Sequence, residues 1–251
     1  MRAKKQFGQH FLRDQSVIKK IISSAEITPG EEVLEIGPGE GVLTQALLSA
    51  GARVTAVEID RDLIDALRER FGKSLNLIEG DILSVPLCKL PATSYKLVAN
   101  LPYNIASAVL EKFFTLPEPP TRFVVMVQRE VGERILAQPP HMSLLSVACQ
   151  MYADARRVTR VPPGAFSPPP KVDSLVVRMD WHPRVVDPES VIALAKKGFV
   201  HPRKQLHRNM EPLFAREKTK KFLASRSLPE TARAQELSVD DWIAIRAHNM
   251  L

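Results

Sequence analysis

Short apolar runs alternate with segments of helical periodicity over the first half of the chain. Each run has the length of a buried strand, and the helical segments place apolar residues three or four positions apart. Strands that alternate with helices predict a mostly parallel sheet covered on both faces. The expected strands are residues 31–36, 53–60, 75–81, 96–100 and 122–128, and the expected helices are residues 42–50, 61–71 and 104–114.

This alternation stops near residue 182. Two further β-like runs, at 155–161 and 174–181, are followed by a region in which only helical periodicity is seen. A change of pattern of this kind is typical of a domain boundary. We therefore expect an α/β domain over residues 1–182, followed by a small all-α domain over residues 183–251.

A glycine-rich loop joins the first predicted strand to the first predicted helix. The segment EIGPGEG places Gly37, Gly39 and Gly41 there. Glycines at such a turn let the backbone approach a ligand and expose helix N-terminal amides to it. The spacing differs from the Gly-x-Gly-x-x-Gly of dinucleotide-binding loops, which argues against a nicotinamide-dependent oxidoreductase. It resembles the loop of class I (Rossmann-like) S-adenosylmethionine-dependent methyltransferases.

Two acidic residues stand at the ends of the next predicted strands. Glu58 ends the second strand, where its carboxylate could accept hydrogen bonds from both ribose hydroxyls of an adenosine. Asp81 ends the third strand, where it could accept from an adenine amine. Ligands of open α/β sheets bind at the carboxyl ends of the strands, so these positions indicate an adenosine ligand. The alternative is that both carboxylates only cap the following helices.

The fourth predicted strand ends in the segment NLPY, residues 100–103. An adenine amine is a poor nucleophile, because its lone pair is delocalised into the ring. Acceptors at the Asn100 side chain and the Leu101 carbonyl could bind its two N–H groups and free the lone pair. Pro102 would stiffen the turn, and Tyr103 could stack on an extruded base. The alternative is a plain turn, with Asn100 as a cap and Tyr103 packed.

Together these segments resemble the ribosomal RNA adenine dimethyltransferases, the KsgA family. FGQHFL, VPPGAFSPPPKVDSLVVR and FVHPRKQLHRN are similar to further motifs of that family, so the resemblance covers nearly the whole chain. It implies methyl transfer from S-adenosylmethionine to N6 of two adjacent adenines. These adenines lie in the 3′-terminal hairpin loop of small-subunit rRNA, and the products are N6,N6-dimethyladenosines. The implied substrate is a pre-formed small ribosomal subunit, and the implied role is in small-subunit biogenesis.

The resemblance also assigns roles to single residues. Phe166 stands where related enzymes place a second aromatic ring against the target base, with core packing as the alternative. Lys171 could contact a phosphate, or it is a solvated loop lysine. The charge state of His10 would be a variable, because histidine titrates near neutral pH. The implied cofactor contacts are His10, Leu12, Gly37, Gly39, Glu58, Asp81 and Asn100.

Basic residues are concentrated at the two ends of the chain. Of the formal net charge of +7, residues 1–20 contribute +5, residues 182–251 contribute +5, and the centre is −3. Basic ends favour a polyanionic partner, and a solvated helix face is the alternative for any one cluster. The basic residues between 196 and 208 have spacings that let them share one helix side, unless Pro202 imposes a kink. The expected RNA-binding residues are Arg2, Lys4, Lys5, Lys171, Arg203, Lys204 and Arg208.

Two other functions fit part of this pattern. A large-subunit rRNA adenine methyltransferase of the macrolide-resistance type would share the fold, the loop and Asn-x-Pro-Tyr. A mainly non-catalytic ribosome assembly factor would share the fold alone. Cys88 and Cys149 have no metal-ligand spacing and are expected to be buried thiols, so no metal site is expected. With no signal peptide or membrane span expected, we predict a cytoplasmic monomer.

Overall fold

The computed structural model describes residues 9–248, which form two compact units. The first unit contains the described residues up to Gly132 together with Ala155–Trp181. The second contains Glu133–Asp154 and the described residues from His182 onward. The division of the chain expected from the sequence therefore needs one correction. Residues 133–154 group with the helical unit, although most of β7 and all of β9, which follow them in the chain, belong to the first unit.

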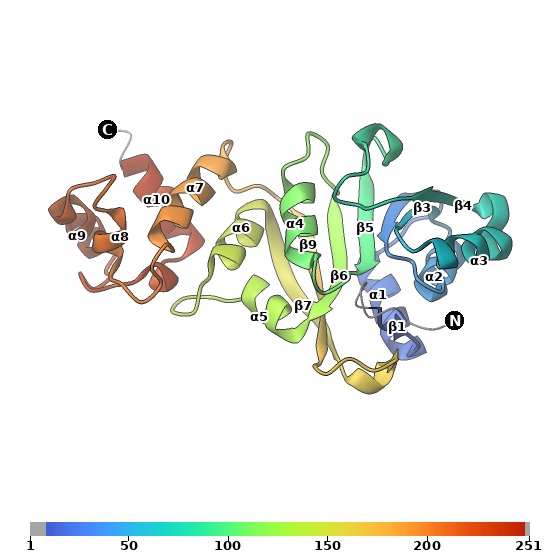
Figure 1. The fold of residues 1–251 in the computed structure, drawn as a ribbon. Helices are drawn as coiled ribbons and strands as arrows, with labels where there is room; N and C mark the ends of the chain where they lie inside the picture. Colours follow the sequence, from blue (N-terminus) through green and yellow to red (C-terminus); the bar gives the residue numbers. More distant parts are fainter. Residues whose placement is uncertain (1–8, 249–251) are drawn as a thin grey trace. The chain divides into compact units, whose positions relative to one another are not determined.

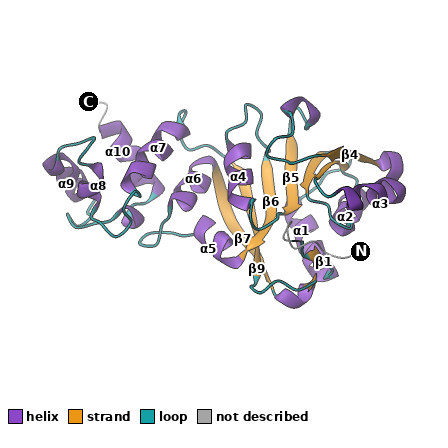
Figure 2. Ribbon diagram, viewed as in Figure 1, coloured by secondary structure: helices purple, strands orange, loops and turns teal. Residues whose placement is uncertain are grey.

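A seven-stranded sheet forms the centre of the first unit (Figures 1 and 2). Its strand order is β4-β3-β2-β5-β6-β9-β7, in which the first five strands run parallel and β9 is antiparallel to β6. Consecutive residues of the central strands are buried, so both sheet faces are covered, as the apolar runs predict. The strands are β2 (Glu32–Ile36), β3 (Arg53–Glu58), β4 (Leu75–Glu79), β5 (Tyr95–Asn100), β6 (Arg122–Gln128), β7 (Ala153–Val161) and β9 (Ser174–Trp181).

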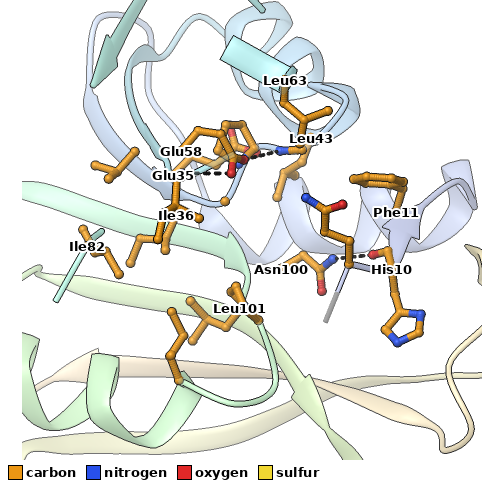
Figure 3. A pocket seen from close by; sticks show the side chains of 18 of the residues that line it. His10, Phe11, Glu35, Ile36, Leu43, Glu58, Leu63, Ile82, Asn100 and Leu101 are labelled. Carbon is orange, nitrogen blue, oxygen red and sulfur yellow. Dashed lines mark hydrogen bonds between the residues drawn. The ribbon is translucent and has the colours of Figure 1, made fainter. Parts of the chain in front are cut away.

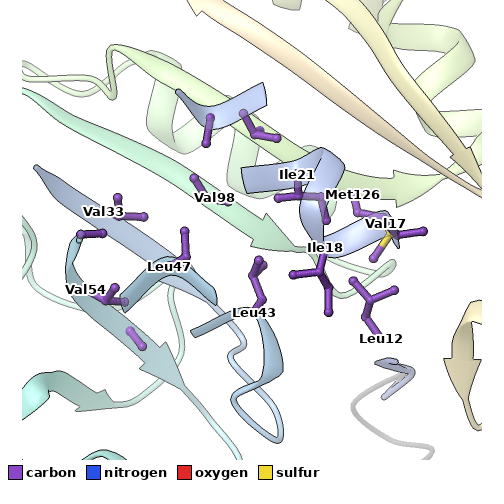
Figure 4. Packing of buried hydrophobic residues seen from close by; sticks show 14 of the residues in the cluster. Leu12, Val17, Ile18, Ile21, Val33, Leu43, Leu47, Val54, Val98 and Met126 are labelled. Carbon is purple, nitrogen blue, oxygen red and sulfur yellow. The ribbon is translucent and has the colours of Figure 1, made fainter. Parts of the chain in front are cut away.

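One helix of the first unit was not expected from the sequence. α1 (Gln15–Ala25) begins after Asp14, whose carboxylate accepts hydrogen bonds from two backbone N–H groups of its first turn. Its apolar side places Ile18 and Ile21 in the same buried cluster as Met126 of β6 (Figure 4). The three expected helices of this unit are present as α2 (Val42–Ser49), α3 (Arg61–Phe71) and α4 (Ala106–Phe114).

Helices also make up the second unit. Trp242 is fully buried at its centre. Gly198, at the end of α7, packs so closely that an added Cβ would lie 2.4 Å from the Trp242 ring. A short helix, α5 (Arg129–Ile135), leads into this unit from β6. The other helices are α6 (Leu144–Tyr152), α7 (Pro188–Gly198), α8 (Leu206–Met210), α9 (Arg216–Ser225) and α10 (Val239–His248).

A two-stranded antiparallel sheet joins the N-terminal segment to the loop between β7 and β9. β1 (Phe11–Leu12) pairs with β8 (Phe166–Ser167). This pairing brings residues 11–12 and 166–167 together, which the linear sequence does not reveal. Cys149 is buried as expected, but Cys88 is exposed, so that part of the cysteine prediction is wrong. No helix within residues 9–248 is long and apolar enough to cross a membrane.

Candidate active site

A cavity of about 240 Å³ opens at the carboxyl ends of β2, β3 and β5 (Figure 3). This is the edge where ligands of open α/β sheets bind. In Figure 3, His10 and Phe11 lie on one side of the cavity, and Glu35 and Glu58 lie on the other. Most of its lining comes from five short segments, residues 9–12, 35–40, 57–59, 80–82 and 100–105.

The glycine loop adopts a backbone that only glycine takes easily. Gly37, Gly39 and Gly41 have φ values of 66°, 59° and 74°. A Cβ at Gly39 would lie 3.0 Å from the ring of Phe11, so the N-terminal segment closes over the loop. The loop therefore combines the backbone conformation and the lack of side chains that a close backbone approach to a ligand requires.

Glu58 lies at the floor of this loop, with 5% of its surface exposed. Its carboxylate accepts hydrogen bonds from the backbone N–H groups of Gly39 (3.1 Å), Ile59 (2.9 Å) and Asp60 (2.9 Å). Burial raises its pKa, and these hydrogen bonds oppose that rise. A carboxylate offers about four lone-pair sites, so about one remains for a ribose hydroxyl. Acceptance from both hydroxyls requires the Gly39 N–H to give up its bond.

Asp81 lines the cavity from a turn rather than from a strand. β4 ends at Glu79, two residues earlier than predicted. Asp81 Oδ1 accepts a hydrogen bond from the Leu83 N–H at 2.9 Å, and its side chain is exposed. The turn holds the carboxylate at the cavity wall and leaves Oδ2 without a protein donor in the described chain. The residue that caps a helix here is Asp60, whose side chain accepts a hydrogen bond from a backbone N–H group in the first turn of α3.

Asn100 is oriented by a backbone carbonyl. Its Nδ2 donates to the carbonyl oxygen of His10 at 3.1 Å, drawn as a dashed line in Figure 3. A carbonyl can only accept, so this bond fixes the nitrogen toward His10 and leaves Oδ1 as an acceptor. No donor within residues 9–248 contacts Asn100 Oδ1 or the Leu101 carbonyl oxygen. Two consecutive residues at the end of β5 therefore each have an unused acceptor.

Tyr103 is held at both ends. Its hydroxyl shares a 2.7 Å hydrogen bond with the hydroxyl of Ser174, which is fully buried at the start of β9. Its ring stacks on the imidazole of His10, with ring centroids 5.6 Å apart. The imidazole Nδ1–H donates to the Pro168 carbonyl at 2.9 Å, which fixes the tautomer. Burial raises the pKa of Tyr103, so the phenol is neutral at neutral pH.

Two residues that were expected from the sequence to have a functional role are buried in the core. Phe166 is 4% exposed, belongs to the main apolar cluster and does not line the cavity, so its position matches the packing alternative. Leu12 is also buried and pairs with Phe166 in β1–β8, but it lines the cavity. Pro102 contacts the glycine loop, since a Cβ on Gly37 would lie 3.7 Å from its ring. The NLPY turn is thus packed directly on the loop.

Sequence reasoning missed two residues of the site. Glu35 lines the cavity and is 1% exposed, and burial raises its pKa to about 8. The Thr44 hydroxyl donates to its Oε2 at 2.6 Å. The sequence did contain a signal for Glu35, because an acidic residue inside the apolar run EEVLEI is unusual. Ser174 had no comparable signal, because its contact with Tyr103 depends on the antiparallel pairing of β9 with β6.

The basic residues predicted to bind RNA do not form one helix face. α7 ends at Gly198, and Arg203 and Lys204 lie in an exposed turn before α8, so the helix is interrupted around Pro202, the case in which no shared helix side was expected. Asn209 Nδ2 holds this turn through the carbonyls of Gly198 (2.6 Å) and His201 (3.0 Å). Arg208 is exposed on the second unit, and Lys171 is exposed on the first. The remaining predicted contacts, Arg2, Lys4 and Lys5, lie outside the described residues.

A family model described as ribosomal RNA adenine dimethylase matches residues 1–248 of the chain. The chain belongs to this family. Among similar proteins, the ribosomal RNA small subunit methyltransferase A of Thermosynechococcus vestitus is 43% identical, over 98% of this chain and 96% of the relative. The protein of the same name from Synechocystis is 40% identical, over 97% of this chain and 95% of the relative.

Two solved enzyme structures share the fold of this chain. The 23S rRNA methyltransferase ErmE superposes with a TM-score of 0.80 at 25% identity, over 96% of this chain and all of that protein. A dimethyladenosine transferase from Plasmodium falciparum superposes with a TM-score of 0.78 at 26% identity, over 93% of this chain and 95% of that protein. These matches confirm the predicted class I methyltransferase fold with a helical second part.

Proposed function

We propose that this protein dimethylates N6 of two adjacent adenines in the 3′-terminal hairpin loop of small-subunit rRNA, using S-adenosylmethionine. The observation that supports this most strongly is the pair of unused acceptors, Asn100 Oδ1 and the Leu101 carbonyl, at the edge of the cavity. Two acceptors there match the two N–H groups of an adenine amine. A hydroxyl or a ring nitrogen of a nucleotide does not have two N–H groups, so it would not use both acceptors.

The cavity has the groups that an adenosine cofactor requires. The left-handed glycine loop lets the backbone approach the ligand, Glu58 offers a remaining lone pair to the ribose, and Asp81 Oδ2 is open to an amine. His10 and Leu12 would close the cavity from the N-terminal side. When bound, S-adenosylmethionine supplies an electrophilic methyl group on a sulfonium and departs as a neutral thioether.

The chain itself would act by positioning and by electrostatics. Hydrogen bonds from the adenine amine to Asn100 and Leu101 pull its lone pair out of conjugation and direct it at the methyl group. Tyr103, locked by Ser174, offers a ring for the base to stack on. No strong base is required, because the product ammonium is acidic and loses its proton to solvent. For the second methyl transfer, one acceptor suffices, since one N–H remains.

Two findings bear on the RNA substrate. Identity of 43% to a small-subunit enzyme, against 25% to a large-subunit enzyme, favours small-subunit rRNA as the substrate.

The acceptor pair and the cofactor-type cavity favour catalysis over a purely structural role in ribosome assembly. We propose the small ribosomal subunit as the substrate particle. We also propose that residues 183–251 help to bind it through Arg203, Lys204 and Arg208, which are exposed on that unit.

Label transfer into isolated ribosomal subunits tests this function. Small and large subunits from cells that lack adenine dimethylation would be incubated separately with the protein and methyl-labelled S-adenosylmethionine. We expect label in small-subunit rRNA alone. Label confined to large-subunit rRNA would favour the resistance-type activity, and cofactor binding without any label would favour a non-catalytic role.

A further inference from the structure

An exposed group of basic residues lies on the first unit and includes none of the residues predicted above to bind RNA. β7 is the edge strand of the sheet, paired only with β9 among the described strands (Figure 1). α1 lies against it, because the Lys20 Nζ donates to the Thr159 hydroxyl at 3.2 Å. We call this group the basic strip; its members are Lys19, Lys20, Arg156, Arg157 and Arg160, all exposed.

The charge of the basic strip is only partly neutralised by the protein. Arg160 forms an ion pair with Asp173, and Arg156 lies 4.0 Å from Glu26. Glu26 is shared, since it also forms ion pairs with Arg122 of β6 and Arg178 of β9. Lys19 and Arg157 have no acidic partner within residues 9–248. The strip therefore presents an excess of positive charge to solvent.

The strip leads toward the candidate active site. Ser174 pairs with Gln128, the last residue of β6, so β9 begins at the sheet edge where Asn100 lies. β7 approaches the same edge at its carboxyl end, since Arg160 pairs with Asp173, the residue before Ser174. The hydroxyl of Ser174 in turn bonds Tyr103. A polyanion lying along β7 would thus reach the cavity rim.

Protection of the sheet edge does not account for this arrangement. Exposed edge strands often contain charged residues that block pairing with another chain, and such residues need to lie on the edge strand itself. Here β7 contributes three arginines, and α1 adds two lysines that are not on the edge strand. Arg156 and Arg160 are about 13 Å apart along an extended strand, long enough to contact more than one phosphate. Arginine also suits bidentate phosphate contacts.

We propose that the basic strip binds the phosphate backbone of the RNA substrate and guides it to the NLPY turn. This inference rests on the proposed function for the identity of the polyanion. It extends that function by giving the methyltransferase unit an RNA surface of its own. Three members of the strip, Arg156, Arg157 and Arg160, lie in the centre of the chain, whose net charge of −3 conceals them.

A double substitution, Arg156→Gln with Arg157→Gln, tests the strip. The matched control is Arg53→Gln with Arg68→Gln, which removes the same charge from two other exposed arginines of the first unit. Binding to small ribosomal subunits would be measured over a range of salt concentrations. Loss of two phosphate contacts should reduce the slope of log affinity against log salt by about 1.4, and lower affinity about 10-fold at 0.15 M salt.

The outcomes separate this inference from the proposed function. Retained cofactor affinity and melting temperature, with a reduced salt slope in the strip variant alone, would support it. A slope equal to that of the wild-type protein, or an equal reduction in the control variant, would overturn it. If the wild-type protein binds the subunits without transferring methyl groups, the proposed function fails, and the salt slopes still decide whether the strip binds RNA.

Discussion

Replacing Glu35 by Gln should change how the stability of the protein depends on pH. Glu35 is buried at the cavity wall, and burial, with a smaller contribution from the charge of Glu58, raises its pKa from 4.5 to about 8. A carboxyl group with a raised pKa binds more protons in the folded than in the unfolded chain between these two values. Its contribution to stability is therefore greatest at acidic pH and is lost as the pH rises toward 8.

The size of this effect follows from the shift in pKa. A rise from 4.5 to about 8 corresponds to a loss of about 5 kcal/mol of folding free energy between pH 4 and pH 9. Glutamine has the same shape, stays neutral and still accepts from the Thr44 hydroxyl. Its extra N–H groups cost a further amount, about 1–3 kcal/mol if left without an acceptor, but that cost is independent of pH.

Urea unfolding of both proteins at several pH values measures the difference. Cofactor would be left out, because a cation in the cavity would favour the ionised carboxylate. We expect the Glu35→Gln protein to gain stability relative to wild type as the pH rises from 5 to 9. Glu69→Gln, a substitution at an exposed position of α3, serves as the control and should show no such trend. A difference between Glu35→Gln and wild type that stays constant over this range would refute the reasoning.

Three further substitutions test the site and the second unit. Asn100→Ala should keep cofactor affinity in calorimetry but lower turnover by at least about 100-fold; turnover near wild type would remove Asn100 from the mechanism. Tyr103→Phe and Ser174→Ala each break the same hydroxyl contact, so their effects on turnover should not add in the double variant; full additivity would contradict the contact. Gly198→Ala should lower stability by about 1–3 kcal/mol, because its Cβ meets Trp242, and an unchanged melting temperature would disprove that packing.

Much of the central sheet could be predicted because its strands are buried on both faces. Such strands are continuous apolar runs, and the boundaries of β6 and β9 agree with the runs 122–128 and 174–181. The helix α6 escaped prediction for a related reason. Six of its nine residues, Ser146 and Gln150 among them, are buried, so it lacks a polar side that would give helical periodicity. Its membership of the second unit depends on tertiary contacts, which no local pattern contains.

The site could be predicted where function depends on position along a strand. The glycine loop, Glu58 and the NLPY turn all line one cavity, because parallel strands end at a common edge. Contacts between distant segments could not be predicted. The stacking of His10 on Tyr103, the burial of Phe166 and the bond from Ser174 all depend on the β1–β8 and β6–β9 pairings. Only the folded chain brings those segments together.

The most direct test of the proposed function is mass spectrometry of nucleosides from treated small-subunit rRNA. Subunits that lack adenine dimethylation would be incubated with S-adenosylmethionine and either the wild-type protein or Asn100→Ala, and the 3′-terminal fragment would be digested. We predict N6,N6-dimethyladenosine at two adjacent positions after treatment with the wild-type protein, and almost none after treatment with Asn100→Ala. Absence of dimethyladenosine with the wild-type protein, under conditions where it binds the cofactor, would contradict the proposal.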